Sequence, residues 1–460
     1  MEPLGLTYNI KTRRNYLFLA VAVSLLCMGL FLWIPASLAG VGGVLFIWLF
    51  FSSRTFRWTV FPAVLIFNQF LIRNTGVPYI IGGLAVQPID WIAILLILTV
   101  ILEQILTGSR FQARTGLEKP IGIFLAALAV SLLNASDLRA GFINWGHTAL
   151  YFLAFYAMVL DWRDVPLERI WRAYFFCALL AALSALWQFF ASGGGRSLGL
   201  AGIPLNHVIV PVLCIELSRL SLGEKFERWW VFTIFLLTAV VTQTRGVWLG
   251  VATLLIVWLF SGSFFQPMTR LVTKRFARKV LGALLVLLLL FYVLAPLLSQ
   301  VAQRAEQLAQ HSGTVYLRLF LWGVALQFFV EHPIVGIGMG QFAGAMGQFP
   351  EMKNLAVFTW THGLSAHNLL LTFLAETGVV GTCGFLILLV ATVRFAWKCV
   401  RDVRTLEELD WGWSFLMIFS VFAISFLFAG SWDYTFVFFL ALMALFFQKR
   451  QIRAELADGR

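Results

Sequence analysis

Residues Val280–Leu298 read VLGALLVLLLLFYVLAPLL and contain no charged side chain. Two similar uncharged, apolar runs are Trp229–Thr244 and Trp411–Trp432. A helix rises about 1.5 Å per residue, so about 20 apolar residues cross a hydrocarbon core about 30 Å thick. The runs show no alternation of apolar and polar residues, which favours helices over the strands of a membrane barrel. Each run therefore predicts a membrane-spanning helix.

The composition of the whole chain indicates the same class. Of 460 residues, 60% are apolar and 12% are charged, and the mean hydropathy is +0.86. A soluble protein of this size needs far more polar surface. The fold class that we predict is therefore all-α, a polytopic transmembrane helical bundle.

About fourteen segments are candidate spans, or twelve if two of them are re-entrant or merged. They lie approximately at 15–34, 37–52, 58–72, 88–107, 120–133, 141–160, 170–191, 207–219, 229–242, 247–262, 280–298, 369–393, 412–430 and 434–448. The first follows three basic residues, as a signal peptide would. Its apolar stretch Tyr16–Ile34 is long for a signal peptide, so we expect an uncleaved span.

One connection is far longer than the others. The predicted organisation is about eleven spans in 1–298, a periplasmic segment 299–366, further spans in 367–448 and a cytoplasmic tail 449–460. The long segment begins with the pattern of a helix lying on a membrane surface. Loops of this length are usually functional or disordered, and its Gly, Trp and Phe content favours order.

The basic residues predict the topology. If the N-terminus is cytoplasmic, 27 of the 34 Lys and Arg fall on the cytoplasmic side, including the Arg270–Lys279 cluster and the tail. That distribution is what the positive-inside rule requires. We therefore expect both termini to be cytoplasmic. The net charge of +12 reflects this topology and predicts no nucleic-acid partner.

The other basic residues fall on the outer side, where they are scarce. They are Arg73, Arg139, Arg196, Arg245, Arg304, Arg318 and Lys353. A cation near a membrane is retained where it pairs with something. For Arg73, Arg139 and Lys353 we expect salt bridges or contacts with lipid head groups.

Three outer arginines are candidates for binding an anion. Arg196 lies in GGGRSLG, whose glycines let backbone amides approach an anion, although a plain turn between spans is the alternative. Arg245 in TQTRG is nearly alone between two apolar spans, so we expect either a structural pair or an anionic ligand. Arg318 lies in a segment, Val315–Trp322, that reads as a helix.

A histidine at the outer mouth of a predicted span is a candidate base. His367 stands just before the run 369–393, and its ordinary pKa of about 6.5 suits proton transfer near neutral pH. The alternative is a structural histidine bonded to a loop carbonyl. Glu376 follows nine positions later, which places it on the opposite face of a regular helix. We therefore expect a structural role for Glu376.

No cofactor is predicted. The run Gly336–Gly340 imitates part of a dinucleotide fingerprint but follows no βαβ pattern, so we expect a turn packed against membrane helices. The remaining histidines lack the spacing of metal ligands, and the outer segments contain no Asp-x-Asp pair. A metal-independent site is the expectation.

The outer residues of the C-terminal half occur in an order that resembles the shared signature of O-antigen ligases and polymerases. The matching residues are Arg318 and Trp322, His332–Gly338, Ala366–Asn368 and Glu376–Gly381. Upstream, Thr244–Gly246 is similar to that family's Ser-Arg-Gly element, with Thr in place of Ser. Residues 196–199 and 204–206 resemble its outer loop. The resemblance covers roughly residues 190–390.

The resemblance implies a glycosyltransferase of the GT-C type at the periplasmic face of a bacterial inner membrane. The donor would be a glycan on undecaprenyl diphosphate, and transfer would invert the anomeric centre without a metal or other cofactor. Arg196, Arg245, Arg318 and Asn368 would bind the diphosphate or substrate, and His367 would act as the base. A ligase would use a sugar hydroxyl of the lipid A core as acceptor.

Two alternatives stay open from the sequence. A polymerase of the same family would transfer the glycan to a second lipid-linked repeat unit. A flippase or other transporter would also be polytopic, but it would more often place charged residues at mid-membrane and show two matching halves. Because the polar residues of this chain cluster at the outer mouth, we expect the transferase, and within it the ligase.

Overall fold

A computed structural model describes residues 34–75, 79–81, 84–108, 115–194, 197–202, 205–221, 229–264, 313–346, 366–401, 403, 405–426 and 434–457. The predicted spans at 15–34 and 280–298 and the surface helix expected after residue 299 lie outside the described residues, apart from Ile34. The division into membrane and periplasmic segments therefore stays a prediction.

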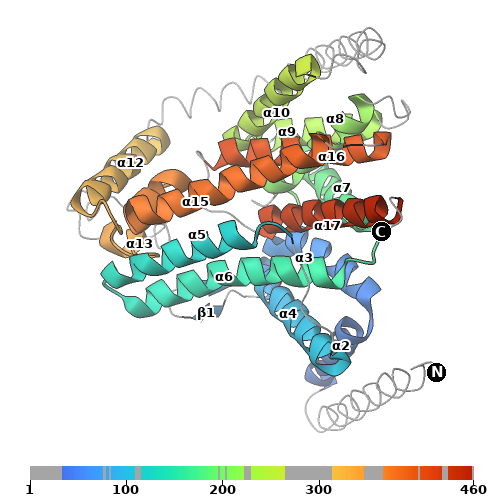
Figure 1. The fold of residues 1–460 in the computed structure, drawn as a ribbon, viewed down its shortest axis with the longest axis horizontal. Coiled ribbons are helices and arrows are strands. Elements are labelled where there is room, and N and C mark those ends of the chain that lie inside the picture. Colours follow the sequence, from blue (N-terminus) through green and yellow to red (C-terminus); the bar gives the residue numbers. More distant parts are fainter. Residues whose placement is uncertain are drawn as a thin grey trace.

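The described residues form a bundle of helices (Figure 1). The elements are α2 (Ile34–Ser52), α3 (Arg54–Thr75), β1 (Tyr79–Ile81), β2 (Leu84–Val86), α4 (Pro88–Thr107), α5 (Glu118–Ser131), η1 (Leu132–Asn134), α6 (Leu138–Asp161), α7 (Leu167–Ala191), α8 (Leu205–Ser221), α9 (Trp229–Val241), α10 (Arg245–Phe264), α12 (Gly313–Glu331), α13 (Phe342–Met346), α15 (Leu369–Arg401), α16 (Leu406–Ser425) and α17 (Tyr434–Ala457). Predicted spans within the described residues coincide with helices.

Six of the described helices, α3, α4, α6, α7, α15 and α17, are long and apolar enough to cross a membrane. This confirms the predicted class, an all-helical polytopic membrane bundle. One small exception is the antiparallel hairpin of β1 and β2, which pairs three residues of each strand. The hairpin was not predicted, because three residues are too few to establish a period-2 pattern.

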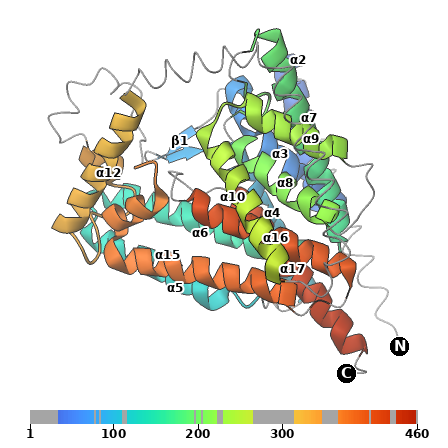
Figure 2. The same ribbon diagram turned by 90° about the horizontal axis from the view of Figure 1, so that it is seen from above.

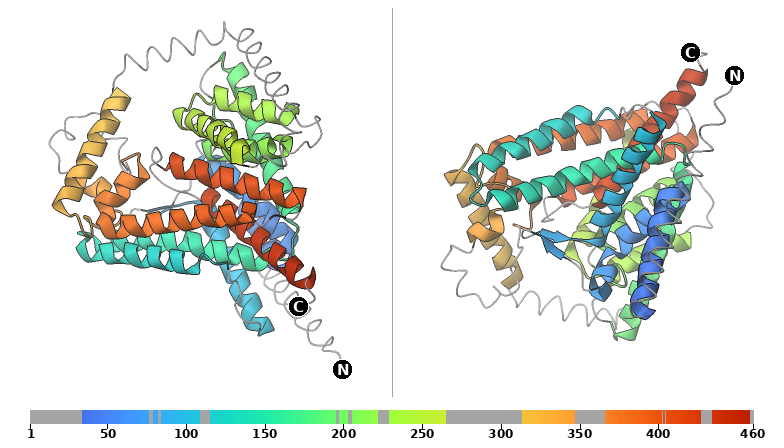
Figure 3. Two further views of the ribbon diagram at one scale, coloured as in Figure 1. Left: turned by 45° about the horizontal axis from the view of Figure 1, so that its top comes forward. Right: turned by 90° about the horizontal axis from the view of Figure 1, so that it is seen from below.

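Helix α15 is the longest described helix and lies at the centre of the contacts. It packs against α5, α16 and α12, and Figures 1 and 3 show α5, α6 and α15 running side by side. Gly384 of α15 allows this approach to α5, because a Cβ atom added there would lie 2.8 Å from Cβ of Ala127. The helix extends about two turns beyond its predicted apolar end, and Lys398 and Arg401 in its last turn suit the negative end of the helix dipole.

Helix α17 is buried on all sides over much of its length. Every residue from Phe436 to Leu445 is at most 2% exposed. A helix that is apolar all round belongs in the core of a large bundle. Stacked and edge-on ring contacts connect it to its neighbours, for example Phe438 with Tyr174 of α7 and with Phe61 of α3. Helix α17 therefore holds the N-terminal and C-terminal helices together.

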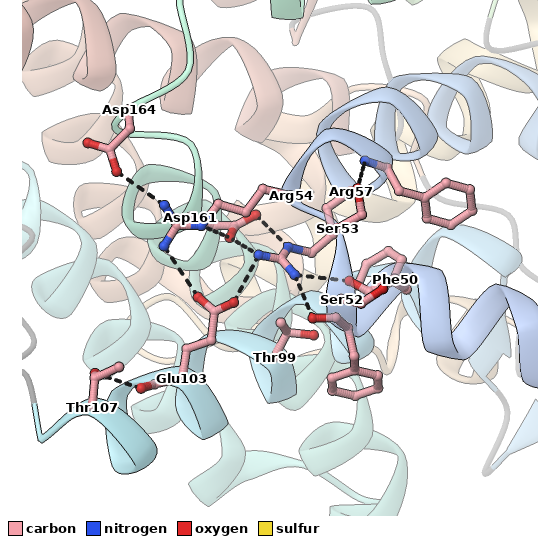
Figure 4. A network of polar contacts seen from close by, with 12 residues as sticks. Phe50, Ser52, Ser53, Arg54, Arg57, Thr99, Glu103, Thr107, Asp161 and Asp164 are labelled. Atoms are coloured by element: carbon pink, nitrogen blue, oxygen red, sulfur yellow. Dashed lines mark hydrogen bonds and ion pairs between the residues drawn. The ribbon is translucent and has the colours of Figure 1, made fainter. Parts of the chain in front are cut away.

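One end of the bundle carries a buried ion cluster (Figure 4). Arg57, which is 1% exposed, donates to both carboxylate oxygens of Asp161 at 2.8 and 2.6 Å and to Glu103 at 3.1 Å. It also donates to the main-chain carbonyls of Phe50 and Phe51. The guanidinium thereby ties α2, α3, α4 and α6 together where an unpaired charge would be costly.

A second arginine at the same end is paired in the same way. Arg219 of α8 contacts Asp410 of α16 at 3.2 Å and Glu168 of α7 at 2.9 Å. Its guanidinium also lies over the rings of Trp171 and Trp411. Arg57 and Arg219, two of the basic residues that the topology prediction assigns to the cytoplasmic side, thus lie at the same end of the bundle. That this end faces the cytoplasm stays a prediction.

The Arg57–Asp161 pair yields a stability prediction. We expect Asp161→Leu to lower the free energy of unfolding by about 3–5 kcal/mol, because it leaves Arg57 buried beside fewer acceptors. The double variant Arg57→Leu/Asp161→Leu should recover most of the loss, since an apolar pair of similar volume is often neutral. Denaturation of the purified protein in detergent measures both.

The matched control is Arg54→Gln, because the Arg54 side chain is 44% exposed and its ion pairs are screened. We expect a change of no more than about 1 kcal/mol for this variant. A loss in Asp161→Leu as small as that in the control would contradict the role given to the buried pair.

Candidate functional site

The start of α15 is held from two sides. On one side, the indole Nε1 of Trp322 in α12 donates to the carbonyl of Ala366 at 3.0 Å. On the other side, the backbone N–H of Leu369 donates to the carbonyl of Phe426, just after α16, at 2.9 Å. The residues between these anchors, His367 and Asn368, are therefore fixed where α12, α15 and α16 meet.

Asn368 caps α15. Its Oδ1 accepts the backbone N–H of Leu371 at 3.1 Å, and its main-chain carbonyl accepts from both the N–H and the hydroxyl of Thr372. An N-cap of this kind satisfies one of the free amides in the first turn. The amide nitrogen of Asn368 takes no part in this cap. The predicted binding role of Asn368 stays a prediction.

His367 has an unusual backbone. Its φ of +49° lies in the left-handed region, which non-glycine residues other than Asn, Asp and His rarely adopt. Such conformations persist where the surroundings hold them, and they gather at functional sites. The side chain is half-buried. Burial lowers the pKa of His367 below its ordinary value of 6.5, and the charge of Arg318 lowers it further.

Arg318 and Trp322 lie on the same face of α12, because they are four residues apart. The helix predicted around Arg318 is confirmed by α12. Since Trp322 contacts Ala366 and the charge of Arg318 acts on His367, that face is turned toward the start of α15. The structure therefore brings together two of the predicted site residues, Arg318 and His367. The Arg318 side chain is exposed, as an anion-binding group needs to be.

Helix α12 lies at the edge of the bundle (Figure 2), and it belongs to a small core of its own. Within the described residues, this outer core is a separate cluster of buried apolar side chains from α12, α13 and the start of α15. Its buried members are Leu321, Val324, Ala325, Phe328, Phe342, Met346, Ala366 and Ala375. Apolar residues of α12 at spacings of three and four explain why this helix packs here.

The glycine run at 336–340 packs against α15, as the sequence analysis expected of a turn. The amides of Ile337 and Gly338 donate to the carbonyls of Ala375 and Glu376, both at 2.9 Å. In the other direction, the amides of Val379 and Val380 donate to the carbonyls of Pro333 and Ile334, which precede the glycine run. These four backbone bonds form a clamp, by which we mean residues 333–340 paired with residues 375–380.

Two glycines allow the clamp to close. Gly378 breaks α15 with a φ of +59° and a ψ of −159°, which frees the amides that follow it. A Cβ atom at Gly378 would overlap the main chain of Ile334, and one at Gly336 would overlap that of Glu376. Both residues also have positive φ, so other side chains are excluded by sterics and by conformation.

Glu376 completes the clamp. Its Oε2 accepts the amide of Gly340 at 2.9 Å, and its Oε1 accepts the amide of Phe342, the first residue of α13, at 3.0 Å. Both carboxylate oxygens are therefore occupied by the backbone. The contacts agree with the predicted structural role of Glu376. The kink at Gly378 lies beyond Glu376, so it does not turn this carboxylate toward His367.

The junction between α5 and α6 lies against the clamp. Asn134 Nδ2 donates to the carbonyl of Gly336 at 2.6 Å. Gln341 Oε1 accepts from the Ser136 hydroxyl and the Asp137 amide, and Gln341 Nε2 donates back to the Asp137 carbonyl. The far ends of α5, α6, α12 and α15 are thereby joined at the end of the bundle opposite Arg57.

The other two predicted clusters are also brought together. Gln243 Nε2 donates to the carbonyl of Gly194 at 3.3 Å, and the Ser197 amide donates to the carbonyl of Val241 at 3.3 Å. The loop that contains Arg196 therefore lies against the turn that precedes Arg245. Arg196 itself lies outside the described residues, and Arg245 is described only as the first residue of α10.

Helix α16 connects the two halves of the site. Gly250 of α10 packs on Val421 of α16, five residues before Phe426, whose carbonyl accepts the amide of Leu369. Figures 1 and 2 show α10 beginning near the end of α16, on the side of the bundle where α12 lies. Arg245, at the start of α10, is thus at the same end as Arg318 and His367.

No metal site is evident among the described residues: they contain no group of three or more His, Cys, Asp or Glu that could hold an ion. The metal independence of the site stays a prediction.

A buried polar cluster was missed in the sequence. Asp90 Oδ1 accepts the Tyr434 hydroxyl at 2.8 Å and lies 2.9 Å from Nε2 of His147, which joins α4, α6 and α17. The sequence does indicate this cluster, because Asp90 lies near the start of the predicted span 88–107 and an acidic residue within a membrane needs a polar partner. His147 was considered only as a metal ligand.

The apolar helices, together with the polar residues around the start of α15, define a polytopic membrane protein with a polar site at one end of the bundle. Residues 230–386, about a third of the chain, match the family model described as O-antigen ligase. The chain carries a domain of this family, as its sequence signature predicted. The matched region contains Arg245, Arg318, His367 and Asn368, and it begins after Arg196, which it does not include. A search of curated proteins found no match.

The clamp generates a prediction about the glycines. We expect Gly378→Ala to destabilise the protein by at least about 1–3 kcal/mol, because it combines a positive φ with overlap against main-chain atoms. The matched control is Gly323→Ala in α12, where a Cβ atom meets nothing within 4 Å. Thermal unfolding in detergent measures both, and equal stability of the two variants would contradict the clamp.

Proposed function

We propose that this protein is an O-antigen ligase of a bacterial inner membrane. It transfers a glycan from undecaprenyl diphosphate to a sugar hydroxyl of the lipid A core at the periplasmic face. The family that the chain matches covers O-antigen ligases and polymerases, so a lipid-linked glycan substrate is implied by membership. The observation that carries the proposal is the contact of Trp322 with Ala366, which turns the face of α12 that bears Arg318 toward His367 at the start of α15.

The arginines suit the leaving group. Transfer breaks the bond between the anomeric carbon and the diphosphate oxygen, so negative charge develops on the diphosphate. Guanidinium groups form paired hydrogen bonds with phosphate oxygens and stabilise such charge. Arg318 is exposed on the face of α12 directed at His367, while Arg245 begins α10 and residues 194 and 197 lie against the turn before it. We assign Arg196, Arg245 and Arg318 to the donor.

His367 suits the acceptor. Direct displacement requires that the acceptor hydroxyl lose its proton as its oxygen attacks the anomeric carbon from the side opposite the diphosphate. A neutral imidazole accepts that proton, and the configuration inverts. Burial and Arg318 both lower the pKa of His367, so the neutral form predominates at neutral pH. The reaction is driven by release of the lipid diphosphate and requires no nucleotide.

The base assignment predicts a specific pattern of loss. We expect His367→Asn to lower the transfer rate by about 10²–10⁴-fold while donor binding persists. Asn tolerates a positive φ, so this variant separates loss of the imidazole from strain at the backbone. Gln327→Ala, an exposed position on α12, serves as the control. The assay uses purified protein in nanodiscs with lipid-linked donor and lipid A core.

Each outcome of that assay bears on a different part of the proposal. Near-normal transfer by His367→Asn would end the base assignment. Transfer by the wild-type protein to a second lipid-linked repeat unit, with none to the lipid A core, would overturn the ligase in favour of a polymerase.

The electrostatic link between Arg318 and His367 predicts a pH effect. Because the pKa of His367 is lowered, transfer by the wild-type protein should persist below pH 6.5 and fall as the pH drops through the lowered pKa. Arg318→Gln removes one cause of the lowering, so the residual activity should be lost at a higher pH than in the wild type. Arg318→Lys should keep the pH profile but bind donor less tightly.

Rate measurements across pH for the three proteins test this link. An unchanged acid limb in Arg318→Gln would show that Arg318 does not act on the group that titrates.

A further inference from the structure

A groove lies at the opposite end of the molecule from the proposed active site. It has a volume of about 480 Å³ and lies between the second half of α15 and the residues that precede α5. Its walls are apolar, with Leu386, Ile387 and Val390 on one side and Leu117 on the other. Arg394 and Lys398 line the same groove further along α15.

The groove has the length of one leaflet of a bilayer. Leu386 and Lys398 are twelve residues apart on a continuous helix, which corresponds to about 18 Å along its axis. Half of a hydrocarbon core about 30 Å thick is about 15 Å. With α15 crossing the membrane and its end at the cytoplasmic surface, as the topology prediction has it, the apolar side chains would face the acyl chains and the two cations would face the head groups.

The packing of α5 on α15 explains why the groove exists. The two helices run in opposite directions, since Asn134 beyond the end of α5 contacts the clamp while Leu117 before its start lines the groove with Arg394. Helix α5 begins at Glu118, whereas α15 continues to Arg401. Among the described residues, α5 therefore does not cover the last part of α15 on this side.

The lining side chains are available to a ligand. Leu386, Ile387 and Val390 are 41%, 45% and 48% exposed, and Arg394 and Lys398 are also exposed. Among the described residues, neither cation forms a salt bridge. This contrasts with Arg57 and Arg219 at the same end of the bundle, which are both neutralised by carboxylates.

An anionic head group would place a negative charge beside Arg394 and Lys398. The carboxylate of Glu118, the first residue of α5, accepts from the Thr115 hydroxyl and amide, so it is already engaged at the helix start. Basic pockets between membrane helices on the cytoplasmic side are suited to anionic lipid head groups. The groove thus combines an apolar channel with two cations that form no salt bridge within the described part of the chain.

We propose that this groove binds an anionic glycerophospholipid of the cytoplasmic leaflet, with its phosphate on Arg394 and Lys398 and an acyl chain along Leu386, Ile387 and Val390. The site is distinct from the donor site, because it lies beyond the kink of α15 at the other end of the helix. The bound lipid fills the gap below α5 and packs against the second half of α15.

The test measures lipid binding to the purified full-length chain by native mass spectrometry. Dioleoyl phosphatidylglycerol is compared with dioleoyl phosphatidylcholine, which has the same chains and no net charge. Each cation near the surface contributes about five-fold to the affinity for an anionic lipid, so we expect the wild type to prefer phosphatidylglycerol by roughly 25-fold. Arg394→Gln/Lys398→Gln should abolish most of this preference.

A matched control separates the groove from general surface charge. Arg169→Gln/Arg401→Gln removes the same charge from exposed positions at the same end, outside the groove. We expect this variant to retain the preference. Ala391→Trp, which fills the groove and leaves its charges in place, should lose the bound lipid. All three variants should retain glycan transfer in the nanodisc assay, so failure of this proposal and failure of the ligase proposal are distinguishable.

A photoreactive residue provides a second measurement, in which Arg394 and Lys398 are left unchanged. Benzoylphenylalanine in place of Ile387 should crosslink to phosphatidylglycerol in vesicles of mixed composition. Equal binding of the two lipids by the wild type, or equal loss in the groove and control variants, would overturn the proposal. Displacement of phosphatidylglycerol by an equimolar amount of undecaprenyl phosphate would also overturn it, in favour of a polyprenyl occupant.

Discussion

The backbone clamp between residues 333–340 and the kink at Gly378 is the constraint on which the outer end of the molecule depends. A break in a membrane helix frees amides and carbonyls, and these must find partners where water is scarce. Here the carbonyls of Pro333 and Ile334 accept the amides of Val379 and Val380. In return, carbonyls of α15 accept the amides of Ile337 and Gly338. Glu376 then accepts the amides at the end of the run and at the start of α13. Each segment supplies hydrogen-bond partners for the backbone of the other, so the two segments hold each other in position.

The position of the proposed base follows from that constraint. With the clamp closed, α12 is drawn against the first turns of α15, and the Trp322 indole reaches the carbonyl beside His367. Phe426 fixes the same helix start from the side of α16. His367 is thus held in a left-handed conformation by contacts on both flanks, and Arg318 acts on it from the face of α12. Positioning of this kind is what proton transfer to a fixed group requires.

The sequence predicted most of the helices because their apolar runs are long and uninterrupted, as in α4, whose bounds of 88–107 were found unchanged. It also predicted the glycine run as a packed turn and a structural Glu376. It missed the β1–β2 hairpin and the cluster of Asp90, His147 and Tyr434. The hairpin is too short for a pattern, and the cluster joins Asp90 to residues 57 and 344 positions away. Pairings such as Trp322 with Ala366 depend on tertiary packing, which periodicity does not encode.

The small outer core formed around Phe328 and Phe342 has an evolutionary consequence. Among the described residues it is separate from the main core, and α15 contributes buried side chains to both. Substitutions around α12 and α13 can therefore accumulate without repacking the membrane bundle. Changes at that end of the molecule thereby leave unaltered the scaffold that places Arg245 at the start of α10.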